Sequence, residues 1–182
     1  AEPFTELLLD GGSYVETRQL VISQTGICLR CPEYTSVITT TDELPVQHTL
    51  LEINAQDVCL QGVSFRPQHK KSSQHITSAA SNRCLMISGN SDARITECSM
   101  CTSGGIGIFI TGSGSARVVG CHFKDSMCGI IVAQDAKPAI NGCVFHTFDT
   151  FAVKFEGKSA GECVDNVVEN CARGGVKSSG KS

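Results

Sequence analysis

Two pairs of cysteines have the spacing of half a metal site. Cys28 and Cys31 form one Cys-x-x-Cys pair, and Cys98 and Cys101 form the other. Four thiolates supplied by two such pairs can hold a structural zinc ion in tetrahedral geometry. However, Cys98 also belongs to a column of residues, described below, that we expect to point into the core, away from a shared metal. We therefore predict no metal site and no cofactor.

The end of the sequence matches a phosphate-binding motif. Residues 175–182 read Gly-Val-Lys-Ser-Ser-Gly-Lys-Ser, which fits the pattern G-x-x-x-x-G-K-[ST]. Such a loop binds phosphate because a following helix offers its N-terminal amides and dipole. The sequence ends at Ser182 without such a helix, and a Gly-, Ser- and Lys-rich segment matches the pattern by composition. We expect residues 177–182 to form a flexible tail without nucleotide binding.

Composition limits the classes of protein and function. The 182 residues are 41% hydrophobic, and fifteen basic against eighteen acidic side chains give a net charge of −3. This predicts a single packed domain that binds neither nucleic acid nor a membrane. Eleven cysteines cannot all pair internally, and no Asn-x-Ser/Thr sequon occurs. These features favour a reducing, intracellular compartment, with the cytoplasm first among them. The opening Ala1-Glu2-Pro3 lacks Met and a signal sequence, so we expect a fragment of a larger protein.

Pairs of apolar residues separated by one residue recur along the chain. Their spacing is nearly constant, except for one longer interval between Ile53 and Ile87. The pairs are Leu7-x-Leu9, Ile27-x-Leu29, Leu51-x-Ile53, Leu85-x-Ile87, Ile108-x-Ile110, Ile130-x-Val132 and Val153-x-Phe155. Apolar alternation over short segments is typical of strands, so we assign all seven pairs to one sheet.

A second set of columns follows the same period. Three kinds of residue recur at intervals of 23 and 22: Ile95, Val118 and Ile140; Cys98, Cys121 and Cys143; and Met100, Phe123 and Phe145. These intervals leave room for two strands per repeat and little room for a helix. Stacking the repeats buries like residues above one another in parallel strands about 4.8 Å apart. In-register thiols in such a column point the same way, so we expect free thiols in the cysteine column.

The repeats predict an all-β fold, a right-handed parallel β-helix of about seven coils with 22–23 residues per coil. A leucine-rich repeat is the competing solenoid, but its Leu-x-x-Leu-x-Leu-x-x-Asn pattern is absent. We expect one domain over residues 1–176. The longer interval predicts an insertion within 66–82, whose polar, locally basic residues favour a solvated surface loop. A phosphate-binding or modifiable loop is the alternative.

The opening Leu7-Leu8-Leu9-Asp10-Gly11-Gly12-Ser13-Tyr14, together with the Ile-x-x-Cys-x-Phe and Gly-Ile-x-Val elements, resembles pectin-lyase-like β-helices with carbohydrate-binding and sugar-hydrolase repeats. Among intracellular members, the chain is most similar to the β-helix regions of Shc SH2-domain-binding protein and its cytokinesis relatives, and next to β-helix F-box-only proteins. The resemblance implies a signalling or cytokinesis scaffold in the first case and a substrate-recognition subunit of a ubiquitin ligase in the second. Extracellular members are lyases, hydrolases or epimerases acting on polyuronates.

The outward positions of the strands test for an active site. Alternation sends two columns outward: Glu52, Met86, Phe109, Ile131 and Lys154, and beside them Asn54, Ser88, Thr111, Ala133 and Glu156. Neither column places two acids on adjacent coils, as paired-carboxylate hydrolysis requires. The remaining candidates are expected in turns or facing solvent, namely Asp92, Asp125, Asp135, Asp149, His122 and His146. We therefore predict that the chain is not an enzyme.

The outward trio Met86, Phe109 and Ile131 is the positive indication of function. Contiguous apolar side chains on a solvent-facing sheet indicate a contact surface, with Glu52 and Lys154 at its ends. We predict a protein-interaction or scaffold module that binds another protein or a neighbouring domain of the parent chain. Coverage of the trio by the 66–82 insertion is an alternative. A carbohydrate-active or glycan-binding domain is the second functional hypothesis.

Overall fold

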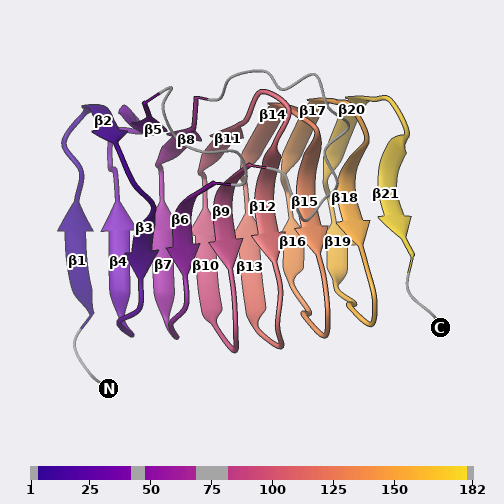
Figure 1. Cartoon of the computed structure of the whole chain (residues 1–182), viewed down its shortest axis with the longest axis horizontal. Helices are drawn as coiled ribbons and strands as arrows, with labels where there is room; N and C mark the ends of the chain where they lie inside the picture. The colour runs from indigo at the N-terminus through magenta and orange to yellow at the C-terminus, as the bar shows by residue number, and fades with distance from the viewer. Residues whose placement is uncertain (1–3, 42–47, 69–81, 180–182) are drawn as a thin grey trace.

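The computed structural model describes residues 4–41, 48–68 and 82–179, which form twenty-one strands in three parallel sheets (Figure 1). The first sheet contains β1 (Thr5–Leu8), β4 (Ile27–Arg30), β7 (Val58–Gln61), β10 (Asp92–Thr96), β13 (Ser115–Val119), β16 (Ala139–Asn141) and β19 (Glu162–Val164). The second contains β2 (Gly12–Glu16), β5 (Ser36–Thr40), β8 (Ser64–Arg66), β11 (Ser99–Cys101), β14 (His122–Ser126), β17 (Val144–Phe148) and β20 (Val167–Cys171). The third contains β3 (Leu20–Ile22), β6 (Thr49–Ile53), β9 (Arg83–Ile87), β12 (Ile106–Ile110), β15 (Cys128–Val132), β18 (Phe151–Phe155) and β21 (Gly174–Ser178).

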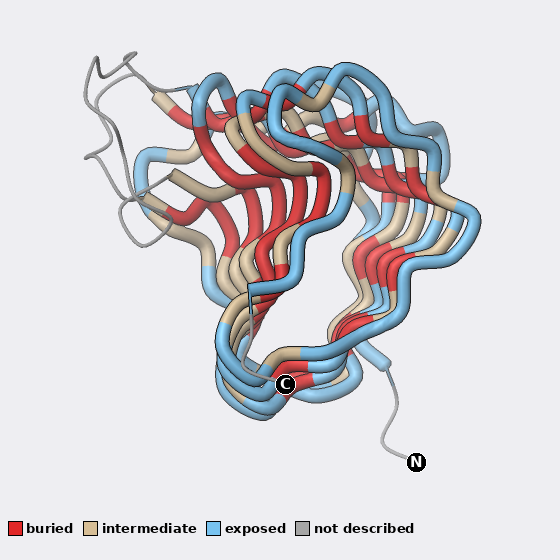
Figure 2. Tube along the Cα trace, turned by 90° about the vertical axis from the view of Figure 1, so that its right-hand side faces the viewer, coloured by how far each residue is buried: buried red, intermediate tan, exposed pale blue. Residues whose placement is uncertain are grey.

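The predicted fold class is confirmed: the described residues form an all-β solenoid of about seven turns. Each coil contributes one strand to each sheet, and every strand pairs in parallel with its equivalent in the next coil. The view along the stack shows buried residues of successive coils lying one behind another (Figure 2). No helix of sufficient length and apolarity to cross a membrane occurs in the part of the chain that the structure describes.

The coils contain three strands, so the prediction of two strands per repeat is wrong. The segment Ala93–Met100 forms a single element of the sequence repeat, but β10 ends at Thr96 and β11 begins at Ser99. A corner separates the two, and its residues adopt a left-handed backbone: Glu97 at φ 54°, with Gly120 and Gly142 at φ 61° and 60° in the next coils. Two short strands differ from one long strand only by the change of direction at these corners. The spacing of apolar residues does not reveal that change, so the sequence predicted one strand in place of two.

The assignment of all seven apolar pairs to one sheet is also wrong for the first two. Leu7 pairs with Leu29, and Leu29 pairs with Leu60, all in the first sheet. Leu51 and Ile53 pair instead with Leu20 and Ile22 of β3, in the third sheet. Because both sheets carry the same apolar-x-apolar pattern, periodicity alone cannot tell them apart. The coil from Ile22 to Ile53 is therefore longer than the regular repeat, so a second lengthened coil precedes the predicted one.

The predicted insertion lies mostly outside the described residues. Arg66 ends β8 and Asn82 precedes β9, while residues 69–81 between them are not described. The predicted tail begins too early, because Lys177 and Ser178 belong to β21 and pair with Lys154 and Phe155. Residues 175–178 of the phosphate-loop match are therefore strand and not loop, and residues 180–182 lie outside the description.

The predicted interior columns are confirmed. Cys98, Cys121 and Cys143 are fully buried, one above another. All eleven cysteines are free thiols. The hydrogen bond from Cys143 lowers the pKa of Cys121, but the bond with Cys98 and burial outweigh it and raise that pKa to about 12. Cys121 is therefore a protonated, apolar packing group at neutral pH.

The aromatic column depends on glycines in the facing strand. The rings of Phe123 and Phe145 stack with centroids 4.8 Å apart and an interplanar angle of 8°. A Cβ atom on Gly107 would lie 2.8 Å from Phe123, and one on Gly129 would lie 2.8 Å from Phe145. Both glycines therefore occupy inward positions at which a larger residue would clash with a phenylalanine ring. The rings fill the space that side chains at these positions would otherwise occupy.

We expect Gly129→Ala to destabilise the fold, because its Cβ would also lie 2.5 Å from the Ala152 carbonyl oxygen. Overpacking of this kind costs about 1–3 kcal/mol, or roughly 2–12 °C in Tm for a domain of this size. The matched control is Gly175→Ala, two coils further along the same column, where the nearest atom lies 3.5 Å away. Thermal melting followed by circular dichroism measures both, and equal Tm values for the two variants would contradict this packing.

Candidate functional site

The outer face of the third sheet carries a contiguous apolar surface. As predicted, Glu52, Met86, Phe109, Ile131 and Lys154 stand in register on successive strands. A second column of outward residues runs beside them, in which Ile106 pairs with Cys128. We define the outer patch as the apolar residues of both columns and the adjacent methionine, namely Met86, Ile106, Phe109, Met127, Cys128, Ile131 and Phe151.

The outer patch contains a small hydrophobic core of its own. Ile106, Cys128 and Ile131 are buried and form a cluster separate from the interior of the coils, and Phe109, Met127 and Phe151 pack against it. Burial raises the pKa of the Cys128 thiol to about 12, which leaves it unreactive at neutral pH. The prediction that Ile131 faces solvent is therefore wrong, since 1% of it is exposed. Met86 and Phe109 are half-buried.

The second column escaped the sequence analysis because it breaks strict alternation. Ile106 is two positions from Ile108, which points inward, and yet it lies in the outer cluster. Gly107 lies between them and points toward the Phe123 ring, so two successive residues face the interior. A glycine inside a strand marks such an irregularity. Gly107 and Gly129, which recur at the period of the repeat, were the signal that could have located this column.

Charged side chains border the outer patch in a fixed order. At one end, the Glu52 carboxylate accepts hydrogen bonds from Gln19 at 2.7 Å and from Ser88 at 2.9 Å. The Arg83 guanidinium lies 4.7 Å from the centroid of the Phe109 ring, and burial lowers its pKa. At the other end, Lys154 forms an ion pair with Glu156, and the Lys177 amine lies 5.2 Å from the Phe151 ring. Glu52 and Arg83 thus stand at the N-terminal end of the patch, and Lys177 and the Lys154–Glu156 ion pair stand at its C-terminal end.

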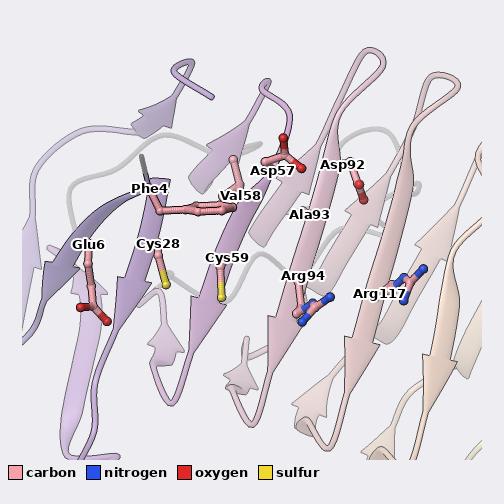
Figure 3. Close-up of a pocket in the computed structure, with 10 residues that line it drawn as sticks. All are labelled: Phe4, Glu6, Cys28, Asp57, Val58, Cys59, Asp92, Ala93, Arg94 and Arg117. Atoms are coloured by element: carbon pink, nitrogen blue, oxygen red, sulfur yellow. The ribbon is translucent and has the colours of Figure 1, made fainter. Parts of the chain in front are cut away.

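The outer face of the first sheet carries a polar groove of about 590 Å³ (Figure 3). Its lining comes from β1, β4, β7, β10, β13 and the residues that precede them, and comprises Phe4, Glu6, Cys28, Asp57, Val58, Cys59, Asp92, Ala93, Arg94 and Arg117. Val58 pairs with Ala93, which places Asp57 and Asp92 opposite each other on neighbouring coils. The groove thus contains two acids on adjacent coils.

These paired acids were missed because the two outward columns tested in the sequence both belong to the third sheet. Asp92 was expected in a turn, but it begins β10 and accepts a hydrogen bond from Ser115 at 3.2 Å. Asp125 was also expected in a turn and lies within β14, at a corner with φ 51°. Asp135 and Asp149 lie between strands, as predicted.

The two Cys-x-x-Cys pairs do not converge on a metal. Cys31 and Cys98 are both buried, whereas Cys28 and Cys101 lie on the outer faces of different sheets. Among the described residues, no three His, Cys, Asp or Glu side chains are arranged to hold a metal ion. His122 and His146 are exposed, and the His146 ring contacts Thr147 at 2.8 Å and Asn170 at 3.2 Å.

The family model of the right-handed β-helix region matches residues 61–182, about two thirds of the chain. The chain belongs to the right-handed β-helix family. No curated protein matches the sequence. The match agrees with the stacked three-sheet coils and with the resemblance to β-helices. It does not confirm a particular similarity to Shc SH2-domain-binding protein or to F-box-only proteins. This β-helix family includes both enzymes and non-enzymes, so its function must be argued from its surfaces.

We expect Ile131→Ser to destabilise this β-helix by about 2–4 kcal/mol, because the side chain is buried in the outer cluster. Val21→Ser is the control, since Val21 stands in the same column on the same face, next to Glu52, and is 57% exposed. That control should change the free energy of unfolding by less than about 0.5 kcal/mol. Urea unfolding gives both values, and a neutral Ile131→Ser would show that the cluster contributes no stability.

Proposed function

We propose that this β-helix is a non-enzymatic protein-interaction module that binds a partner protein, or a neighbouring domain of its parent, through the outer patch. The observation that supports the proposal most is the second hydrophobic cluster, which lies outside the coil interior and includes the half-buried Phe109, Met127 and Phe151. A solenoid buries apolar residues inside its coils, and stacking the coils does not require a second apolar cluster on an outer face. Apolar residues gathered there are typical of a binding surface.

The charged residues at the two ends of the outer patch indicate which charges its partner carries. Lys177 at one end favours acidic side chains, since Lys154 is already paired with Glu156, and Glu52 at the other end favours basic ones. Between them, Met86 and Phe109 offer an adaptable thioether and an aromatic ring to apolar side chains. We infer a partner segment with a central apolar run, an acidic end and a basic end. Among roles for such a module, adaptor functions in signalling, cytokinesis or ubiquitin-ligase substrate recognition in the cytoplasm follow from the resemblance.

We expect Phe109→Ser to weaken partner binding at least tenfold, because aromatic anchors carry a large share of interface energy. Lys177→Glu should weaken binding several-fold, and more at low salt, by reversing the charge at the basic end. Lys124→Glu, at a lysine that is also exposed but lies on the outer face of the second sheet, is the control and should bind like the parent. A partner is first captured from cell extract with the parent chain and purified, and its binding is then measured by titration with each purified variant.

Melting curves must accompany these titrations, because Phe109 packs on a buried cluster. Phe109→Ser should remain folded at the assay temperature. If Lys124→Glu and Lys177→Glu weakened binding equally, or if Phe109→Ser bound normally, the outer patch would not be the binding surface.

The groove of the first sheet favours a second candidate function, a glycan-binding or carbohydrate-active domain. Asp57 and Asp92 stand on neighbouring coils, and Arg94 and Arg117 line the same groove beside them. The strand spacing of about 4.8 Å is close to the separation of about 5–5.5 Å between the two carboxyl groups of retaining glycosidases. The exposed ring of Phe4 adds an apolar surface on which a sugar ring can pack.

If this second function operates, Asp92→Asn should lower polysaccharide cleavage by about 10²-fold or more, because removing a general acid or base costs that much. Asp135→Asn, at an exposed turn outside the groove, should have no effect. Release of reducing ends from neutral and acidic polysaccharides is the measurement. Binding or cleavage that is insensitive to Asp92→Asn would exclude the groove as the site.

A further inference from the structure

Two thiols stand side by side in the groove of the first sheet. Cys28 of β4 pairs in register with Cys59 of β7, so both side chains project from the same face of the sheet. Both are half-buried, line the groove, and point in the same direction (Figure 3). The Cys59 thiol donates a hydrogen bond to Cys28. The pair therefore forms a dithiol that is reachable from solvent.

The register sets the separation of the two sulfurs. In-register side chains of neighbouring strands lie about 4.8 Å apart. A metal–thiolate bond is about 2.3 Å long, so a metal ion midway between two such sulfurs would meet both in a nearly straight line. The spacing of the sheet thus matches linear, two-coordinate geometry without movement of the backbone.

This geometry selects the metal. A structural zinc ion takes four ligands, and among the described residues no three metal-ligating side chains are grouped. Copper(I) is soft and is selected by thiolate ligands, and two of them suffice for it. We propose that Cys28 and Cys59 form a binding site for copper(I), bridged between their two sulfurs. The site is independent of the outer patch on the third sheet.

The charges around the dithiol suit the complex. One copper(I) ion and two thiolates carry a net charge of −1, and binding releases the thiol protons. Arg94 stands in register beside Cys59, and its guanidinium, with that of Arg30, favours negative charge on this sulfur. The ion must displace the proton of each thiol when it binds. Affinity should therefore fall as the pH is lowered.

Other cysteines of the described residues lack one part of this arrangement. Cys98, Cys121 and Cys143 have the same spacing, but they are fully buried in the coil interior, where an ion would be stripped of water. Cys101 is half-buried on an outer face, and its in-register neighbour is Lys124. Cys171 pairs with Phe148. The Cys28–Cys59 pair combines spacing with access.

The test is an anaerobic titration of the reduced chain with copper(I) in competition with a chromophoric copper(I) chelator. The parent chain should take up one tightly bound ion, which Cys28→Ser and Cys59→Ser should each bind at least 100-fold more weakly. Cys101→Ser is the matched control and should bind like the parent. Arg94→Gln should weaken binding several-fold, whereas Arg117→Gln, one coil further along the sheet, should change it less.

X-ray absorption of the copper-loaded chain provides the second readout. Two sulfur neighbours and no nitrogen or oxygen neighbour are expected. The proposal would be overturned if Cys59→Ser still bound the ion tightly. It would also be overturned if Cys101→Ser lost as much affinity for copper(I) as Cys59→Ser. A spectrum with three or more sulfur neighbours would also overturn it, because it would place the ion among other thiols. Circular dichroism of each serine variant confirms that the coils remain folded.

Discussion

Parallel pairing in register is the constraint on which the rest of this structure depends. Each strand is hydrogen-bonded to its equivalent in the next coil, so each side chain has a side chain of the same position about 4.8 Å above and below it. Any residue type whose side chain packs favourably against an identical side chain can therefore form a column. Isoleucine, cysteine and phenylalanine do so inside the coils, and Phe123 and Phe145 gain a stacking contact from it. The same stacking makes unsuitable substitutions destabilising, because a side chain that does not fit in one coil clashes directly with the coils above and below it.

The constraint explains which parts of the fold were predictable. Columns of identical or similar residues at a fixed period, such as Cys98, Cys121 and Cys143, leave a trace in the sequence that is typical of a solenoid. The number of coils and the identity of the interior residues follow from that trace. The division of each coil among three sheets does not, because corner residues such as Glu97 and Gly120 share a backbone conformation and not a residue type. Leu29 and Ile53 consequently look alike in sequence and lie in different sheets.

The candidate surfaces were predictable in part, for the same reason. Alternation identified Met86, Phe109 and Ile131 as one outward column. It could not show that Ile106 and Cys128 stand beside them, because Gly107 and Gly129 interrupt the alternation to make room for two phenylalanine rings. The burial of Ile131 is a consequence of that second column, and a surface expected to be a strip of single residues is two columns wide. Interior packing thus determines the shape of the outer patch through the glycines.

In-register stacking has opposite consequences inside and outside the coils. Inside, the cysteine column is fully buried, and the Cys121 and Cys143 thiols donate hydrogen bonds to backbone carbonyls and act as small apolar groups. Outside, Cys28 and Cys59 have the same spacing, but an open groove and the guanidinium of Arg94 lie beside them. Access from the groove is what allows this pair, unlike the interior column, to act as ligands. The backbone of each coil repeats, and only the surroundings of a side chain differ. Whether a cysteine faces the interior or the groove therefore decides its chemistry, and its spacing in the sequence does not.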